Sequence, residues 1–334
     1  MPRNSFQSSP ELDEILRRSG NQANRADALA ATRELALALQ EPLRKGVLAG
    51  DILDGIYETV ELAPGAVPQF PLDLLAPGTE RNFVAYTVPN QGRIPERHVE
   101  ADYVMIPTYE IAAAIDWLLR FARDARWDVV GRAMEVLQGS FVKKMNDDGW
   151  HTILAAGVDR NILVYDSDAN AGQFTKRLVS LMKTVMRRNG GGNSTSLNRG
   201  ILTDLYLSPE CIEDVRNWGV DLIDEFTRRE IYVNEGAVTR IFQVNLHEID
   251  ELGQSQEYEN FFLNQLSGSI QGSDVELLVG LDLRNTDSFI SPVRQPVEIV
   301  EDDSLHRQRR SGLYGSAELG FAALDNRRVI LGSC

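Results

Sequence analysis

Cysteine and long apolar segments are scarce in this sequence of 334 residues. Its two cysteines, Cys211 and Cys334, are too few for a zinc cage or a disulfide framework, so we expect a reducing intracellular environment. No apolar run approaches the roughly 18–20 residues that span a bilayer. Residues 1–20 also lack the continuous apolar segment of a secretory signal, so neither a membrane-spanning nor a secreted protein is expected.

Positive charge, and lysine in particular, is also in short supply. Acidic residues outnumber basic ones by 49 to 34, and the formal net charge is −15 at pH 7. This balance argues against a protein that grips a phosphate backbone over a broad surface, and against a polybasic membrane binder. Only five basic residues are lysines. The others are arginines, which suit fixed, partly desolvated pairing with carboxylates.

The composition that remains is that of a globular protein, with 43% hydrophobic and 25% charged residues. Residues 1–60 are predicted to be polar and helical. Ser9 and Pro10 form a typical helix start, and residues 28–39 are rich in the helix formers Ala and Leu. Because the apolar positions do not form one wide stripe, we expect an arm that lies on another surface.

A long hairpin is predicted next. Proline and glycine interrupt residues 61–80, and strands are then expected at residues 81–88 and 97–106 around a turn at 89–92. A hairpin of this size is marginal in water by itself. We therefore expect it to lie against the body of its own chain or against a neighbour.

A long helical region is predicted from residue 107 onward. Apolar residues from Trp127 to Met145 recur at three- and four-residue spacing and mark a helix that reaches about residue 155. Further elements alternate without a strict strand–helix–strand rhythm, which favours an α+β fold. The expected strands are 161–165, 202–207, 239–246 and 275–283, the expected helices are 174–186 and 209–218, and residues 312–331 are expected to form a strand–turn–strand ending.

No catalytic, cofactor-binding or metal-binding residue is predicted. Residues 166–170 have the opening spacing of a calcium loop, but Arg177 stands where a bidentate Glu is required, so we expect a capped turn. The glycine-rich residues 190–196 lack the lysine of a phosphate-binding loop. One alternative from another class stays open, a soluble metal-dependent enzyme that uses His247 with Glu248 or Asp250.

The order of these elements resembles that of tailed-bacteriophage major capsid proteins of the Hong Kong 97 fold. Residues 320–332, Gly-Phe-Ala-Ala-Leu-Asp-Asn-Arg-Arg-Val-Ile-Leu-Gly, look like the closing stretch of such proteins. Residues 202–215, a strand followed by Ser208-Pro209-Glu210 and a helix, resemble another of their segments. The resemblance implies an N-terminal arm (1–60), an extended loop (61–105), a peripheral domain with a spine helix (106–157), an axial domain (158–294) and a C-terminal β segment completing the peripheral or axial domain (295–334).

The resemblance also implies a function. The chain would assemble into hexamers and pentamers of an icosahedral shell that encloses double-stranded DNA, inside a host bacterial cytoplasm, and would remain in the virion. Its expected partners are other copies of itself, a portal and a decoration protein. Because no long scaffolding segment precedes the arm, we expect a separate scaffolding protein or none. An encapsulin-like nanocompartment shell is the alternative within the same fold.

The extended loop carries the predicted contacts between subunits. Residues 61–105 contain no lysine, so the covalent cross-linking of some capsids lacks its usual reactive group. Alternating apolar positions and charges near the loop tip favour contact with a neighbouring subunit. The candidate contact residues are Arg81, Phe83, Tyr86, Arg93, Arg97, Glu100 and Asp102.

Overall fold

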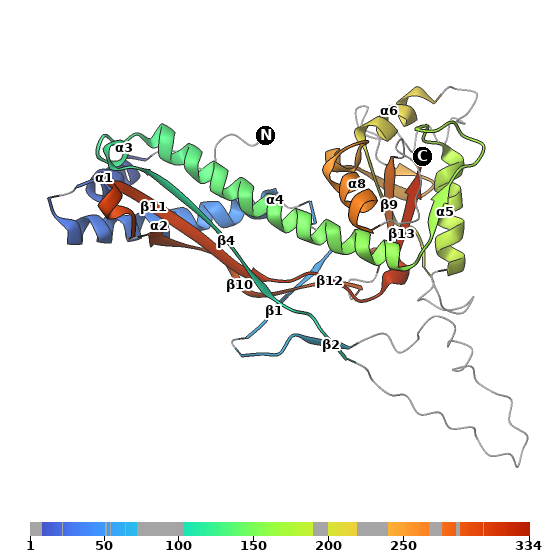
Figure 1. Ribbon diagram of the computed structural model, residues 1–334, viewed down its shortest axis with the longest axis horizontal. Coiled ribbons are helices and arrows are strands. Elements are labelled where there is room, and N and C mark those ends of the chain that lie inside the picture. Colours follow the sequence, from blue (N-terminus) through green and yellow to red (C-terminus); the bar gives the residue numbers. More distant parts are fainter. Residues whose placement is uncertain are drawn as a thin grey trace, which may run out of the picture. The chain divides into compact units, whose positions relative to one another are not determined.

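The computed structural model describes residues 9–21, 23–50, 52–53, 55–63, 65–71, 103–189, 200–218, 240–266, 276–284, 288–302 and 304–334 (Figure 1). The chain divides into two compact units. Unit one comprises Met1–Pro68, Ile106–Gly149 and Ser291–Phe321, and unit two comprises Gln69–Met105, Trp150–Ile290 and Ala322–Cys334.

Unit one combines long helices with a sheet of long strands. Its elements are α1 (Pro10–Ser19), α2 (Arg25–Ala49), β1 (Glu58–Glu61), β4 (Tyr109–Leu118), α3 (Leu119–Arg123), the larger parts of α4 (Trp127–Asp159) and β10 (Phe289–Asp302), and β11 (Arg310–Leu319). The sheet order is β1-β10-β11-β4, and Figure 1 shows the three long strands running side by side. The predicted start of the first helix is confirmed, because the Ser9 hydroxyl accepts a hydrogen bond from the Leu12 N–H at 3.2 Å.

The helical prediction is wrong for residues 109–118, which form strand β4. This strand pairs antiparallel with β11 along its whole length, from Tyr109 opposite Leu319 to Leu118 opposite Arg310. Ile111 and Trp117 are both buried, and they share one face of the strand because they lie six positions apart. Alanines in the middle of the strand favour a helix intrinsically, but ten residues of strand pairing and a half-buried face outweigh that weak preference.

The core of unit one is apolar and includes the N-terminal helices. Leu16 of α1 and Leu39 of α2 are buried in one cluster with Met134 and Phe141 of α4 and Leu313 of β11. Much of the apolar surface of residues 10–49 is therefore covered within the unit itself, although Leu37 and Leu48 remain 64% and 69% exposed. The end of α2 also lies directly on α4, because the Asn146 side-chain amide donates to the Gly50 carbonyl at 3.2 Å.

Unit two is built around a mixed six-stranded sheet of order β5-β13-β9-β6-β8-β7. Its elements are β2 (Gln69–Pro71), β3 (Tyr103–Met105), β5 (Leu163–Tyr165), α5 (Lys176–Asn189), β6 (Asp204–Leu207), α6 (Pro209–Asn217), β7 (Arg240–Ile241), β8 (Val244–Glu248), α8 (Glu257–Phe261), β9 (Leu277–Leu281), β12 (Ala322–Ala323) and β13 (Val329–Ser333). Strands β5 and β8 run parallel to their neighbours β13 and β6, and the other pairs are antiparallel.

Both faces of the central strands in unit two are covered. All five residues of β9 and of β13 are buried, as expected for strands between two layers. Helix α5 places Leu178 and Met182 in the same cluster as Leu205 of β6 and Ile212 of α6. The predicted helix after Ser208 is confirmed, since its hydroxyl accepts from the Cys211 N–H at 3.2 Å. The α+β class predicted from the sequence is likewise confirmed by the mixed helix and sheet architecture.

Candidate functional site

All seven predicted contact residues of the extended loop lie outside the described part of the chain. They are Arg81, Phe83, Tyr86, Arg93, Arg97, Glu100 and Asp102. The described residues on either side do pair with each other, because β2 and β3 form an antiparallel ladder from Gln69 opposite Met105 to Pro71 opposite Tyr103. Residues 72–102 therefore leave and re-enter the described structure at neighbouring strands.

The histidine of the enzyme alternative has a partner other than the predicted one. Its Nε2 lies 2.9 Å from Oδ1 of Asp204, on the neighbouring strand β6. Glu248 follows His247 directly in strand β8, so the two side chains point to opposite faces of the sheet. His247 and Glu248 thus do not converge on one ligand.

Asp204 is held in its charged form by this arrangement. Its Oδ1 also accepts a hydrogen bond from the Asn245 amide at 2.9 Å. Burial by itself favours the neutral carboxyl, but hydrogen bonds from His247, Thr203 and Asn245 outweigh burial and lower the pKa of Asp204. The pair ties β6 to β8, and the His247 ring stacks on Tyr206 with a centroid distance of 4.7 Å.

The acidic turn at residues 166–170 is structural. The Thr175 hydroxyl donates to Oδ2 of Asp166 at 2.8 Å, just before α5 begins. The Arg177 guanidinium bonds to Asp168 and lies 3.5 Å from Asp166. An arginine thus occupies the charge position that a cation would need, which confirms the capped-turn interpretation.

The closing stretch of the chain contains a buried ion-pair network that sequence reasoning did not identify. Arg328, at the end of the short helix Asn326–Arg328, is 2% exposed and places its guanidinium 2.6 Å from Oδ2 of the fully buried Asp282. Arg284 lies 2.8 Å from the same oxygen, and the Ile201 N–H donates to it at 3.0 Å. Asp325 binds Arg327 at 2.6 Å and lies 3.4 Å from Arg328.

Nearby arginines decide whether the buried Asp282 carboxyl is ionised. Burial favours its neutral form, but hydrogen bonds from Arg284 and the Ile201 N–H, together with the charge of Arg328, outweigh burial and lower its pKa. The network therefore holds Asp282 in its charged form inside unit two. It fixes the start of β13 against the end of β9, and the Asp282 N–H donates to the Arg328 carbonyl at 3.0 Å.

A second buried cluster joins the two cysteines. The sulfurs of Cys211 and Cys334 are 3.5 Å apart, and the Cys211 sulfur lies 2.9 Å from Oε2 of Glu276. The contact with Cys334, burial and the nearby Glu276 carboxylate all raise the pKa of the Cys211 thiol. Sequence reasoning missed this cluster because the two cysteines are 123 residues apart.

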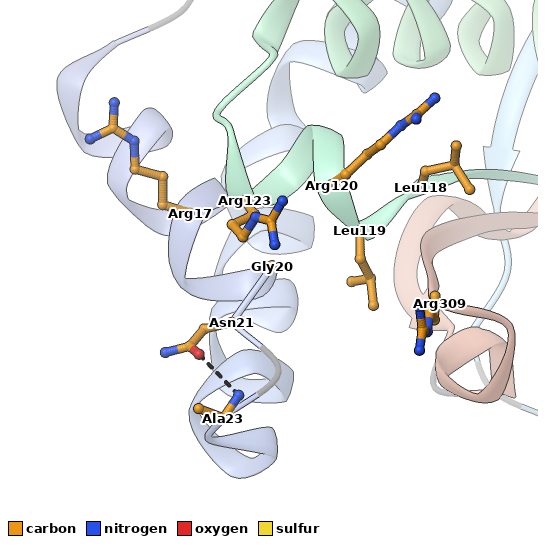
Figure 2. A pocket seen from close by; sticks show the side chains of 9 residues that line it. All are labelled: Arg17, Gly20, Asn21, Ala23, Leu118, Leu119, Arg120, Arg123 and Arg309. Carbon is orange, nitrogen blue, oxygen red and sulfur yellow. Dashed lines mark hydrogen bonds between the residues drawn. The ribbon is translucent and has the colours of Figure 1, made fainter.

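An arginine-lined hollow of about 770 Å³ opens on unit one, between the end of α1, α3 and the start of β11. Arg17, Arg120, Arg123 and Arg309 line it, and none of the described lining residues is acidic. Figure 2 shows that the four side chains point in different directions. The hollow is thus suited to several anionic groups on a surface, and less to one small anion held by converging donors.

No protein-family profile matches the amino-acid sequence of this chain. No curated protein matches it either.

Solved structures do match, across most of the chain. A protein of Microbacterium phage Oxtober96 is similar with a TM-score of 0.59 and 9% identity, over 84% of this chain and 90% of that one. The capsid of an empty GTA particle is similar with a TM-score of 0.54 and 13% identity, over 85% of this chain and 89% of that one. The acidic stable capsid of Helicobacter pylori bacteriophage KHP30 is similar with a TM-score of 0.52 and 9% identity, over 83% of this chain and 87% of that one. The chain has the Hong Kong 97-like fold of phage capsid proteins.

The capsid fold extends over both units. Each match covers more of the chain than either unit contains, so the likeness cannot be confined to one of them. The resemblance inferred from the order of elements is thereby confirmed at the level of fold. No helix in the described part of this capsid fold is long and apolar enough to cross a membrane.

Proposed function

We propose that this chain is the major capsid protein of a tailed phage. In this proposal, it assembles into pentamers and hexamers of an icosahedral shell that encloses double-stranded DNA. Assembly takes place in the host bacterial cytoplasm, and the mature protein stays in the virion. A portal, a decoration protein and a separate scaffolding protein are proposed partners.

One observation carries this proposal, the structural likeness to capsids across both units of the chain. The net charge of −15 supports it independently. Confined DNA is itself polyanionic, and a basic inner wall would adsorb it and hinder its release. An acidic subunit is compatible with a container that must hold DNA and later let it go.

The paired strands β2 and β3 support a role for residues 72–102 between subunits. They place Pro71 and Tyr103, the described residues on either side of this segment, opposite each other. Tyr103 and Met105 expose about three-fifths of their surface, 60% and 62%. We propose that the loop lies on a neighbouring subunit, where these apolar side chains become covered.

The arginine-lined hollow supplies a surface of opposite charge for such contacts. The chain is strongly acidic overall, while Arg17, Arg120, Arg123 and Arg309 gather around one hollow in unit one. Oppositely charged patches orient subunits and fix their register even when single exposed ion pairs contribute little. We propose that carboxylates of an adjacent copy bind there.

The alternatives are less well supported. An encapsulin-like shell would share the fold, and cargo enzymes inside purified particles would favour it. A soluble metal-dependent enzyme that used His247 with Glu248 would need the two to converge, but these side chains point to opposite faces of the sheet.

Particle size tests the proposed function. The purified chain, alone or expressed with a scaffolding protein, should give closed shells of megadalton mass in native mass spectrometry and electron microscopy. A monomer or small oligomer under both conditions would contradict the proposal.

Replacing residues 84–100 with a short Gly-Ser linker should abolish shells while circular dichroism stays nearly unchanged. Normal shells from that variant would remove the loop from the assembly mechanism.

A further inference from the structure

Two thiols and a carboxylate from three separate elements meet inside unit two. Cys211 lies in the first turn of α6, Glu276 lies just before β9, and Cys334 lies just after β13. One ligand atom from each residue falls within 4.8 Å of the other two. Among the residues that the structure describes, this is the one group of three or more such side chains with metal-ligand spacing.

The backbone holds all three side chains in place. Glu276 and Cys334 exchange two backbone hydrogen bonds of 3.2 Å, which extends the β9–β13 pairing to the cluster. Ser208 caps α6 by accepting from the Cys211 N–H, also at 3.2 Å. The three residues are thus fixed by elements that the fold requires for other reasons.

The spacing of the ligand atoms fits a thiophilic metal ion. Two thiolates at about 2.3 Å from one tetrahedral Zn²⁺ lie about 3.8 Å apart. The two sulfurs here are 3.5 Å apart, so they need to separate only slightly. The distance from the Cys211 sulfur to the Glu276 oxygen is 2.9 Å and would open to about 3.5 Å around the same ion.

We propose that Cys211, Cys334 and Glu276 bind one thiophilic divalent cation, with Zn²⁺ as the physiological ion and water as the fourth ligand. On binding, each thiol releases its proton to solvent, and the two thiolates and the carboxylate donate electron pairs to the ion. No oxidant or reductant is involved. The site would join α6, β9 and β13 within one subunit, and it does not depend on shell assembly.

Two further features match a metal site. The Ser208 hydroxyl donates to Oε2 of Glu276 at 2.6 Å, which orients the carboxylate as an outer partner of a metal ligand does. Cys211 and Ser208 are buried, whereas Cys334 is only partly buried, which gives an ion a path to the sulfurs.

A disulfide is the competing chemistry for the same sulfurs. It would require an oxidant such as molecular oxygen, and the sulfurs would have to approach from 3.5 Å to about 2.05 Å. A disulfide also gives no role to Glu276, whose carboxylate contacts the Cys211 thiol directly. The geometry therefore favours the metal.

Cadmium titration of the full-length, reduced chain tests the proposal, with a reductant that contains no thiol. We expect one Cd²⁺ per chain, a thiolate-to-cadmium charge-transfer band in the ultraviolet, and displacement by Zn²⁺. Cys211→Ser and Cys334→Ser should lose stoichiometric binding, and Ser208→Ala should bind about 10-fold more weakly. The matched control is Glu248→Gln, which removes an exposed carboxylate of unit two and should bind normally.

Alkylation of the wild-type chain gives a second readout that needs no variant. Stoichiometric Zn²⁺ should protect both cysteines from iodoacetamide, and a chelator should restore the reaction. The proposal is overturned if the reduced chain shows no charge-transfer band, or if Cys334→Ser retains it unchanged. It is equally overturned if the only reaction of the two sulfurs is disulfide formation, read as a loss of two hydrogens by mass.

Discussion

The two units of this chain bury different kinds of side chain. In unit one, the described buried polar residues are all uncharged: Ser19, Thr32, Asn146, Ser291 and Ser311. In unit two, six described Asp, Glu and Arg residues are buried: Asp204, Glu259, Glu276, Asp282, Arg327 and Arg328. Unit one is therefore held mainly by apolar shape complementarity, while unit two also contains buried ion pairs, of which Arg328–Asp282 is the most buried.

This difference determines which substitutions each unit should tolerate. An apolar core loses stability when volume is removed or added, because packed side chains relax only partially. A buried ion pair loses most when one partner disappears, because the remaining charge stays in a poorly solvated site. The following substitutions test that distinction, from the largest expected effect to the smallest.

Removing the central carboxylate of unit two should have the largest effect. Asp282→Ala leaves Arg328, 2% exposed, without its partner at 2.6 Å. Breaking a buried pair in this way costs about 3–5 kcal/mol. Urea denaturation should show this loss of unfolding free energy. The matched control, Asp116→Ala, breaks an exposed pair with Arg310 in unit one and should cost no more than about 1 kcal/mol. Equal losses in both variants would contradict the comparison.

The Asp282 contribution should also depend on pH. Because the pKa of Asp282 is lowered in the folded state, its stabilisation is fully present above the pKa of the unfolded carboxyl, about 3.9. It is lost as the pH falls through the folded-state value. The melting temperature of the wild type should therefore fall more steeply with decreasing pH than that of Asp282→Asn. Parallel curves would show that Asp282 is not held ionised.

Adding a single methyl group tests the apolar core of unit one. A Cβ on Gly315 of β11 would lie 2.8 Å from the Phe141 ring, closer than packed carbon atoms approach. Gly315→Ala should therefore cost about 1–3 kcal/mol through overpacking. In a Phe141→Leu background the added methyl has more room, so the cost should be smaller there. A double-mutant cycle by denaturation measures this coupling, and strictly additive costs would rule out the proposed clash.

These contrasts also explain what the sequence could predict. The Ser208 cap with α6 and the strand β6 depend on local patterns, namely a capping serine before proline and a short apolar run. Helix α4 follows from its apolar spacing, although it continues to Asp159, beyond the predicted end. Strand β4 was missed because its alanines favour a helix locally, and its pairing partner β11 lies about two hundred residues away in sequence.

The buried sites could not be predicted because their partners are distant in sequence. From the sequence, residues 320–332 show only a resemblance to the closing stretch of other capsid proteins. Their physical role depends on Asp282, which lies 46 positions before Arg328. Cys211 and Cys334 looked like isolated residues, and nothing local links either of them to Glu276. Residues far apart in sequence meet only through strand order, which short-range periodicity does not specify.

The smallest effect is expected for an ion pair in unit one that is nearly as short as the buried Arg328–Asp282 pair but includes an exposed lysine. On α4, Lys144 Nζ lies 2.7 Å from Asp148 four residues later, close to the 2.6 Å of the Arg328–Asp282 pair. The Lys144 side chain is 54% exposed, so water and salt already stabilise its charge when the pair is apart, and the Tyr109 hydroxyl still donates to the Asp148 carboxylate at 2.7 Å. Lys144→Met should therefore lower the unfolding free energy by only about 0.3–0.5 kcal/mol, and by less in high salt. If this loss, measured by urea denaturation, approached that of Asp282→Ala, burial would not be what separates the two units.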